Sequence, residues 1–100
     1  MTFVVTMRFE GDPKRAHAVL RDNPDLYEAI HEGIYRHGLI RCERFVGDGE
    51  FFDVDYWPSE AERKAFVAAA GPQLKRWNEL MGFTATDVRT WTVADDGEEF

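Results

Sequence analysis

The feature that most constrains the fold is a pattern of strand and helix signals that occurs twice along the chain. Residues 2–10 place Phe3 and Met7 on one face and Val4 and Arg8 on the other, the period of two typical of a strand. Two helical segments follow, over 13–22 and 24–37. Asp12 before Pro13 and Asn23 before Pro24 each predict an N-cap followed by a first-turn proline, and Gly38 ends the second segment.

The second half of the chain repeats this order. Two alternating runs between residues 39 and 57 flank Gly47, Asp48 and Gly49, a composition that predicts a tight hairpin. Ser59 and Glu62 then form a capping box that begins a helix, which Gly82 ends. We expect this helix to be broken at Gly71 and Pro72. Residues 84–93 alternate again and predict a fourth strand.

The order strand, helix, strand, strand, helix, strand predicts an α+β, ferredoxin-like βαββαβ domain with a four-stranded antiparallel sheet and both helical regions on one side. We expect this domain to span residues 1–94 and an acidic tail to occupy 95–100. Apolar side chains occur on both faces of the strands: for example, Phe52 and Tyr56 lie on one face of their strand and Trp57 lies on the other. The uncovered face therefore predicts a homodimer, because a second copy would bury it.

Charge and cysteine content exclude several classes of function. A formal charge of -7 disfavours nucleic acid and anionic membranes as partners. The first twelve residues are too short and too alternating for a signal peptide or a membrane span, so we expect a soluble cytoplasmic protein. Cys42, the single cysteine, is interpreted as a small buried strand residue without chemistry. No spacing of histidines and carboxylates predicts a metal site.

Asp53, Asp55 and Trp57 alternate along one strand and so share a face. Trp57 and Asp53 are candidates for substrate binding, and Asp55 is the candidate base, since burial beside aromatic rings would raise the pKa of a carboxyl group. The alternative is that arginines of adjacent strands neutralise the aspartates, with Arg8, Arg41, Arg44 and Arg89 as the available partners. The two interpretations differ in whether this face meets the helices.

Histidines and aromatic residues on the helices supply further candidates. His37 shares a helical face with Ile34, which aims its ring at the sheet as a candidate proton shuttle; the alternative is a last-turn histidine at a helix C-terminus. Tyr27, His31 and Tyr35 recur every four residues, and with Trp77 of the later helix they either frame a substrate cleft or serve as packing and dimer contacts.

The segment DVDYWPSEAERKAF resembles the dimeric α/β-barrel superfamily, and within it the small proteins grouped with the antibiotic biosynthesis monooxygenases. Trp57, Ser59 and Phe66 match a Trp-x-Ser-x-x-x-x-x-x-Phe pattern, and the hairpin VGDGEFFDVDYW also fits. The resemblance implies a homodimer that works without a cofactor. It also implies an acidic C–H or phenolic aromatic ligand, whose carbanion reduces oxygen in an apolar pocket.

The haem-degrading members of the superfamily resemble one another in an asparagine on the first strand and an iron-binding histidine on the last helix. Here Met7 stands at the asparagine position, where we count it as a substrate-binding residue, and no histidine occurs from Ala61 to Gly82. A proximal histidine holds iron in such sites, so haem cleavage is disfavoured.

Three functions remain open from the sequence. The first is a dimeric cofactor-independent monooxygenase that acts on a small aromatic or polyketide-like metabolite. The others are a barrel that binds a small molecule without catalysis, and a structural or regulatory partner protein. As a further hypothesis, the breaks at Pro24 and at Gly71 with Pro72 would widen a pocket between the helices and the sheet.

Overall fold

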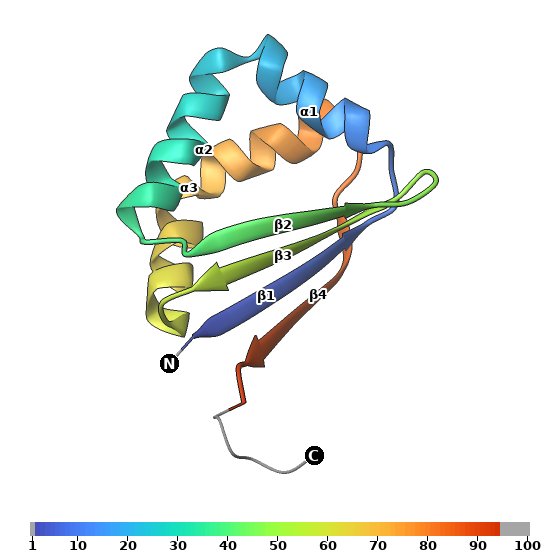
Figure 1. Cartoon of the computed structure of the whole chain (residues 1–100). Helices are drawn as coiled ribbons and strands as arrows, with labels where there is room; N and C mark the ends of the chain where they lie inside the picture. The colour runs from blue at the N-terminus through green and yellow to red at the C-terminus, as the bar shows by residue number, and fades with distance from the viewer. Residues whose placement is uncertain (1, 95–100) are drawn as a thin grey trace.

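The computed structural model describes residues 2–94, which form one sheet covered on one side by helices (Figure 1). The elements in chain order are β1 (Phe3–Phe9), α1 (Pro13–Asp22), α2 (Pro24–Arg36), β2 (Arg41–Val46), β3 (Phe51–Trp57), α3 (Glu60–Met81) and β4 (Ala85–Thr92). The strands are antiparallel in the order β2-β3-β1-β4. The predicted ferredoxin-like fold is confirmed. The acidic tail predicted for 95–100 lies outside the described residues.

The helix boundaries follow from local chemistry. The Asp12 side chain accepts a hydrogen bond from the Lys14 N–H at 2.9 Å, as expected of an N-cap. Asn23 behaves differently from the prediction, because its side-chain amide donates to the Val19 carbonyl at 2.7 Å and makes no side-chain cap bond to α2. It therefore ends α1, while Pro24 begins α2. Gly82 adopts a left-handed conformation with φ of 83° and ends α3.

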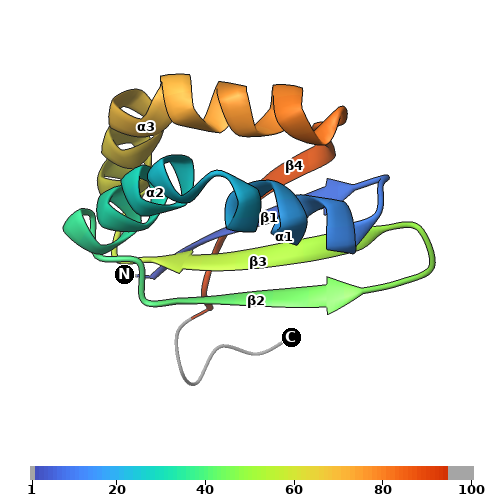
Figure 2. The same ribbon diagram turned by 90° about the horizontal axis from the view of Figure 1, so that it is seen from above.

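The predicted break at Gly71 and Pro72 is wrong, since α3 runs from Glu60 to Met81 with Pro72 inside it. The helix instead bends between its two halves (Figures 1 and 2). A proline inside a helix removes one backbone hydrogen bond and bends the axis without ending the helix when packing holds both halves. Figures 1 and 2 show the two halves of α3, together with α1 and α2, on the same side of the sheet.

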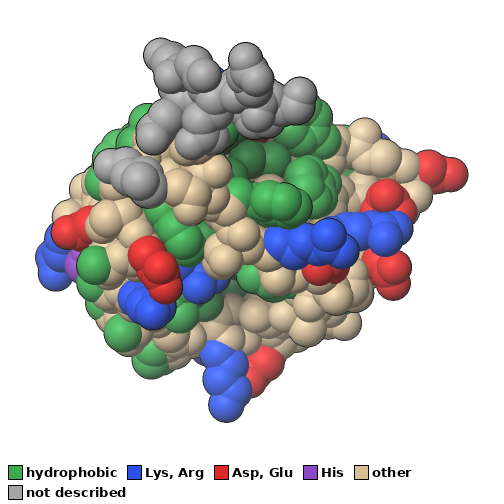
Figure 3. All heavy atoms as spheres, turned by 90° about the horizontal axis from the view of Figure 1, so that it is seen from below, with side chains coloured by type: hydrophobic (Ala, Val, Ile, Leu, Met, Phe, Trp, Pro, Cys, Tyr) green, Lys and Arg blue, Asp and Glu red, His purple; other side chains and the backbone are tan. Residues whose placement is uncertain are grey.

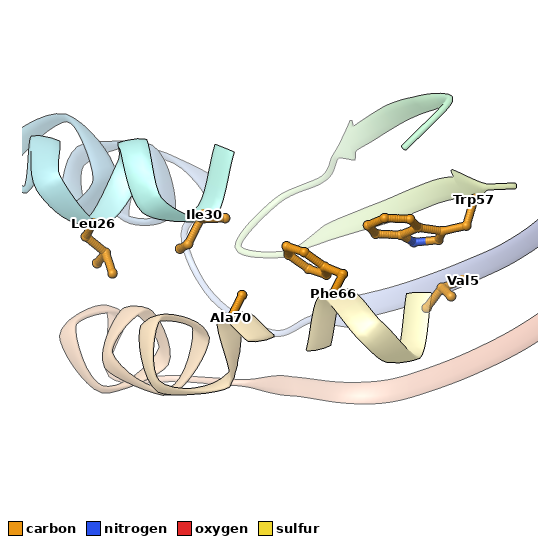
Figure 4. Packing of buried hydrophobic residues seen from close by; sticks show 6 residues of the cluster. All are labelled: Val5, Leu26, Ile30, Trp57, Phe66 and Ala70. Carbon is orange, nitrogen blue, oxygen red and sulfur yellow. The ribbon is translucent and has the colours of Figure 1, made fainter. Parts of the chain in front are cut away.

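Two apolar clusters join the helices to the sheet. The first contains Val5, Leu26, Ile30, Trp57, Phe66 and Ala70 (Figure 4), and the second contains Phe9, Ala16, Val19, Phe51 and Met81. Gly33 allows α2 to approach α3 closely, because a Cβ at this position would lie 3.2 Å from the Phe66 ring. Trp57 is a member of the first cluster, so the face of β3 that carries Trp57, Asp55 and Asp53 meets the helices.

The opposite face of the sheet has no helix over it among the described residues. Figure 3 shows apolar side chains gathered on this side, with charged groups around them. We define the outer face by Val4, Phe52, Val54, Tyr56 and Trp91, the side chains that alternate with the helix-facing residues. Trp91 is 49% exposed and Phe52 is 38% exposed.

Candidate functional site

A cavity of about 470 Å³ lies between the helices and the sheet. Its sheet side comes from three neighbouring strands, and its helix side comes mainly from α2 and α3. The side chains that line it include Val5, Met7, Tyr27, Ile30, His31, Ile34, Tyr35, Cys42, Arg44, Asp53, Asp55, Trp57, Arg63, Phe66, Val67, Leu74 and Trp77. A volume of this size suits a small organic ligand.

Aromatic rings form the apolar wall of the cavity. Trp57 is 2% exposed, and its ring centroid lies 5.1 Å from that of Phe66, with the two planes tilted by 32°. Figure 4 shows the two rings side by side, with Val5 beside them. Trp77 joins this wall from the second half of α3, where its indole N–H donates to the Ala16 carbonyl at 3.4 Å. Flat aromatic ligands pack well against such surfaces.

Asp53 is neutralised by an arginine of the neighbouring strand. Arg44 lies directly opposite Asp53 in the ladder between β2 and β3. Its Nε–H donates to Oδ1 at 2.7 Å and its Nη2–H to Oδ2 at 2.9 Å. The alternative that an arginine satisfies this carboxylate is therefore realised, even though Asp53 faces the helices. Met7 lies opposite Asp53 on the other side, in β1, and also lines the cavity.

Asp55 stands two residues from the Asp53 ion pair and makes no ion pair with a described residue. Burial raises the pKa of its carboxyl group, and the negative charge of Asp53 adds to this effect. A hydrogen bond from the Cys42 thiol and the positive charges of Arg44 and Arg63 act in the opposite direction. Asp55 is therefore a stronger base than an ordinary aspartate, placed on the polar side of an aromatic cavity.

The prediction that Cys42 is a buried strand residue is wrong in its burial, because Cys42 lies in β2 but is exposed. Cys42 lies opposite Asp55 in the ladder between β2 and β3, lines the cavity and is solvent-accessible. Protein atoms that crowd the thiol, together with its hydrogen bond to Asp55, raise the pKa of Cys42 to about 12. The thiol is therefore protonated at neutral pH and acts as a donor rather than a nucleophile.

The predicted stripe on α2 lies along the cavity. The Tyr27 and His31 rings stack with centroids 5.0 Å apart, and Tyr35 meets His31 edge-on at 4.7 Å. All three side chains line the cavity, although Tyr35 is 71% exposed. The stripe thus forms the more open side of the site.

His37 is not among the residues that line the cavity. It caps the C-terminus of α2, its Nδ1 lies 3.2 Å from Glu62 Oε2, and its ring meets Phe66 edge-on at 6.5 Å. The arrangement links the end of α2 to the first turn of α3. The structure brings Asp55 and Trp57 together but does not bring His37 to them.

Arg63 is a charged lining residue that the sequence did not single out as a candidate. The signal was available, because Arg63 stands three and four residues before Phe66 and Val67 and so occupies the apolar face of α3. A charged residue on the apolar face of a helix points to a role beyond packing.

No group of three or more histidine, cysteine, aspartate or glutamate side chains within residues 2–94 is arranged to hold a metal ion. Within the same range, no helix has the length and apolar character needed to cross a bilayer. What the cavity offers is an aromatic wall, a basic carboxylate, a thiol and the three guanidinium groups of Arg41, Arg44 and Arg63.

No protein-family model matches the chain, and no curated protein matches its sequence. Solved structures are similar in fold. SnoaB, a cofactor-independent oxygenase from Streptomyces nogalater, has a TM-score of 0.60 at 17% identity, covering 98% of this chain and 96% of that chain. A putative antibiotic biosynthesis monooxygenase from Deinococcus radiodurans has a TM-score of 0.66 at 13% identity, covering 100% and 99%.

A dimeric ferredoxin-like protein from an uncultured marine organism has a TM-score of 0.64 at 12% identity, covering 98% of this chain and 93% of that chain. At these identities the similarity establishes the fold. The resemblance to antibiotic biosynthesis monooxygenase-like proteins is confirmed at that level.

Proposed function

We propose that this protein binds a small aromatic molecule in the cavity between its helices and its sheet, and oxidises it as a cofactor-independent monooxygenase. The observation that carries the proposal is the placement of Asp55, a carboxylate with a raised pKa, in an aromatic cavity of about 470 Å³. The shared fold with SnoaB, which is described as a cofactor-independent oxygenase, supports the same class of chemistry.

The proposed reaction begins with proton transfer to Asp55 from an activated C–H group of the ligand. A base with a raised pKa is better suited to this step than an ordinary aspartate. The resulting carbanion gives an electron to O₂, and the radical pair combines to a peroxide anion, which takes the proton back from Asp55 to become a hydroperoxide. Loss of water then leaves a carbonyl group, so that CH₂ and O₂ become C=O and H₂O with no external reductant. Trp57 and Trp77 hold the rings, and the Cys42 thiol donates to Asp55.

We further propose that the protein acts as a homodimer joined through the outer face. Val4 is buried and Val54 and Tyr56 are partly buried there, whereas Phe52 and Trp91 expose large apolar surfaces. Ion pairs at the surface, such as Arg8 with Glu50 at 3.0 Å, accompany this apolar centre. An apolar centre with charged surroundings is typical of an interface between subunits. The similar marine protein is described as dimeric, which supports this arrangement.

Oxygen uptake tests the proposed activity. The probe is a polycyclic phenol whose methylene group is activated by a ring carbonyl, and the uncatalysed rate without protein is subtracted. The proposal expects one O₂ consumed for each carbonyl formed, and a loss of about 10²-fold or more in rate for Asp55→Asn. Asp48→Asn makes the same change at the exposed hairpin tip and is the matched control.

A non-catalytic binding protein is the other function that the cavity allows, because Arg44 already neutralises one of the two aspartates. It predicts saturable binding of the same probe, with an oxygen uptake no faster than the protein-free reaction. Uptake above that rate in both wild type and Asp55→Asn would remove Asp55 as the base.

A further inference from the structure

Arg63 occupies a position in α3 where helix packing alone would select an apolar residue. Spacings of three, four, eleven and fourteen residues relate it to Phe66, Val67, Leu74 and Trp77, all of which line the cavity. Arg63 is partly buried and lines the same cavity. A guanidinium placed among these side chains is costly unless it meets a counter-charge.

Among residues 2–94, Glu60, Glu62 and Asp53 have other partners, whereas Asp55 lines the same cavity without an ion pair. Glu62 contacts His37 at 3.2 Å, and Glu60 contacts Lys64 at 2.9 Å. Asp53 is held by Arg44. Arg63 itself makes no ion pair within 4.0 Å with a described residue, although its charge acts on Asp55.

The position in the helix adds to this cost. Arg63 follows the N-cap Ser59 by four residues, at the end of the first turn. The N-terminus of a helix carries partial positive charge, which favours an anion there and disfavours a cation. Glu60 and Glu62 already occupy the first turn of α3, so the charge that favours a negatively charged group inside the cavity is that of Arg63.

We propose that Arg63 binds a carboxylate carried by the aromatic ligand, so that the preferred ligands of the cavity are aromatic carboxylates. The fork of a guanidinium group matches the two oxygens of a carboxylate, which stays ionised at neutral pH. Trp57 and Phe66 hold the ring on the apolar wall, while Arg63 fixes the direction of the carboxylate. Arg44 cannot take this role without giving up Asp53.

This proposal rests on the proposed function only in requiring that the cavity bind an aromatic ligand. It is tested by titrating the full chain with 2-naphthoate and with 2-naphthamide, which has nearly the same shape and no charge, and following heat release. Wild type is expected to bind the carboxylate about tenfold or more tightly than the amide. Arg63→Gln is expected to lose this preference while its affinity for the amide changes little.

Two further variants sharpen the test. Arg63→Lys keeps the charge but not the fork, and is expected to retain part of the preference. Lys75→Gln removes one positive charge from an exposed position of α3 that does not line the cavity, and should leave the preference intact. Thermal unfolding of each variant checks that the fold is kept.

Equal affinities of wild type for the two ligands, or a preference that survives in Arg63→Gln, would overturn the proposal. The comparison in wild type needs no variant, so a variant that fails to fold does not leave the question open. If neither ligand binds to wild type, ligand binding in the cavity fails, and with it the proposed function. Binding of the amide alone contradicts only the role of Arg63.

Discussion

Arg44 and Asp53 form a two-point ion pair at the sheet side of the cavity, with nitrogen–oxygen distances of 2.7 and 2.9 Å. Asp53 is 5% exposed, and Arg44 supplies the hydrogen-bond donors for its buried carboxylate. The guanidinium of Arg44 also lies over the Phe51 ring, 4.6 Å from its centroid. The pair thus ties the edge strand β2 to β3 between the cavity and the second apolar cluster.

Removal of Arg44 is expected to destabilise the fold. Arg44→Met leaves the buried Asp53 carboxylate without its donors, which costs about 1–3 kcal/mol in the free energy of unfolding. The double variant Arg44→Met with Asp53→Leu should recover part of that loss, because no unpaired charge remains. Urea unfolding followed by circular dichroism measures both.

Arg21→Met is the control for the Arg44 variant, because Arg21 pairs with Asp22 on the surface, where both side chains are more than half exposed. It should change stability by no more than about 0.5 kcal/mol. If Arg44→Met and Arg21→Met lowered the free energy of unfolding equally, the buried Arg44–Asp53 ion pair would contribute no more to stability than a surface ion pair.

The raised pKa of Asp55 predicts a pH dependence of stability with a definite sign. Because the folded state holds this proton more tightly than the unfolded chain, the contribution of Asp55 to stability is greatest below its ordinary pKa. The contribution falls as pH rises toward the raised value in the folded state. Asp55→Asn does not titrate, so its melting temperature relative to wild type should rise with pH across this window.

Thermal scans of wild type and Asp55→Asn between about pH 4 and 8 measure this difference. Asp48→Asn, at the exposed hairpin tip, corrects for the loss of one negative charge. If the melting temperature of Asp55→Asn instead fell relative to that of wild type as pH increases, the folded state would lower the pKa of Asp55.

The outer face predicts the oligomeric state. Each chain has a mass of 11.6 kDa, and light scattering coupled to size exclusion should give twice that mass for wild type. Val54→Arg places a charge at the centre of the outer face and should give the mass of one chain, because an unpaired charge in an apolar interface is costly.

Ala68→Arg adds the same charge at an exposed position of α3 and should leave the dimer intact. A wild-type mass of one chain at micromolar concentration would contradict the dimer. An unchanged mass in Val54→Arg would move the interface elsewhere on the molecule.

The alternation of β1 and β3 was sufficient to predict the strands and the shared face of Asp53, Asp55 and Trp57, because the period of two is a local property of the backbone. Pro72 shows where local signals fail: the same residue type that separates α1 from α2 at Pro24 only bends α3, since packing of both halves decides the outcome. The pairing of Asp53 with Arg44 rather than another arginine required the strand register. The direction of the His37 side chain depended on where α2 ends, and the periodicity of the sequence does not determine that end.

The most direct test of the central claim uses the three tryptophans of the chain. Trp57 and Trp77 line the cavity, and Trp91 lies on the outer face, where its indole N–H donates to Thr6 at 3.0 Å. Protein labelled with ¹⁵N at its indole nitrogens is titrated with 2-naphthol and followed by NMR. Binding in the cavity predicts that the Trp57 and Trp77 signals shift together with one dissociation constant while the Trp91 signal stays in place. A shift of Trp91 alone, or of none of the three, would contradict the account.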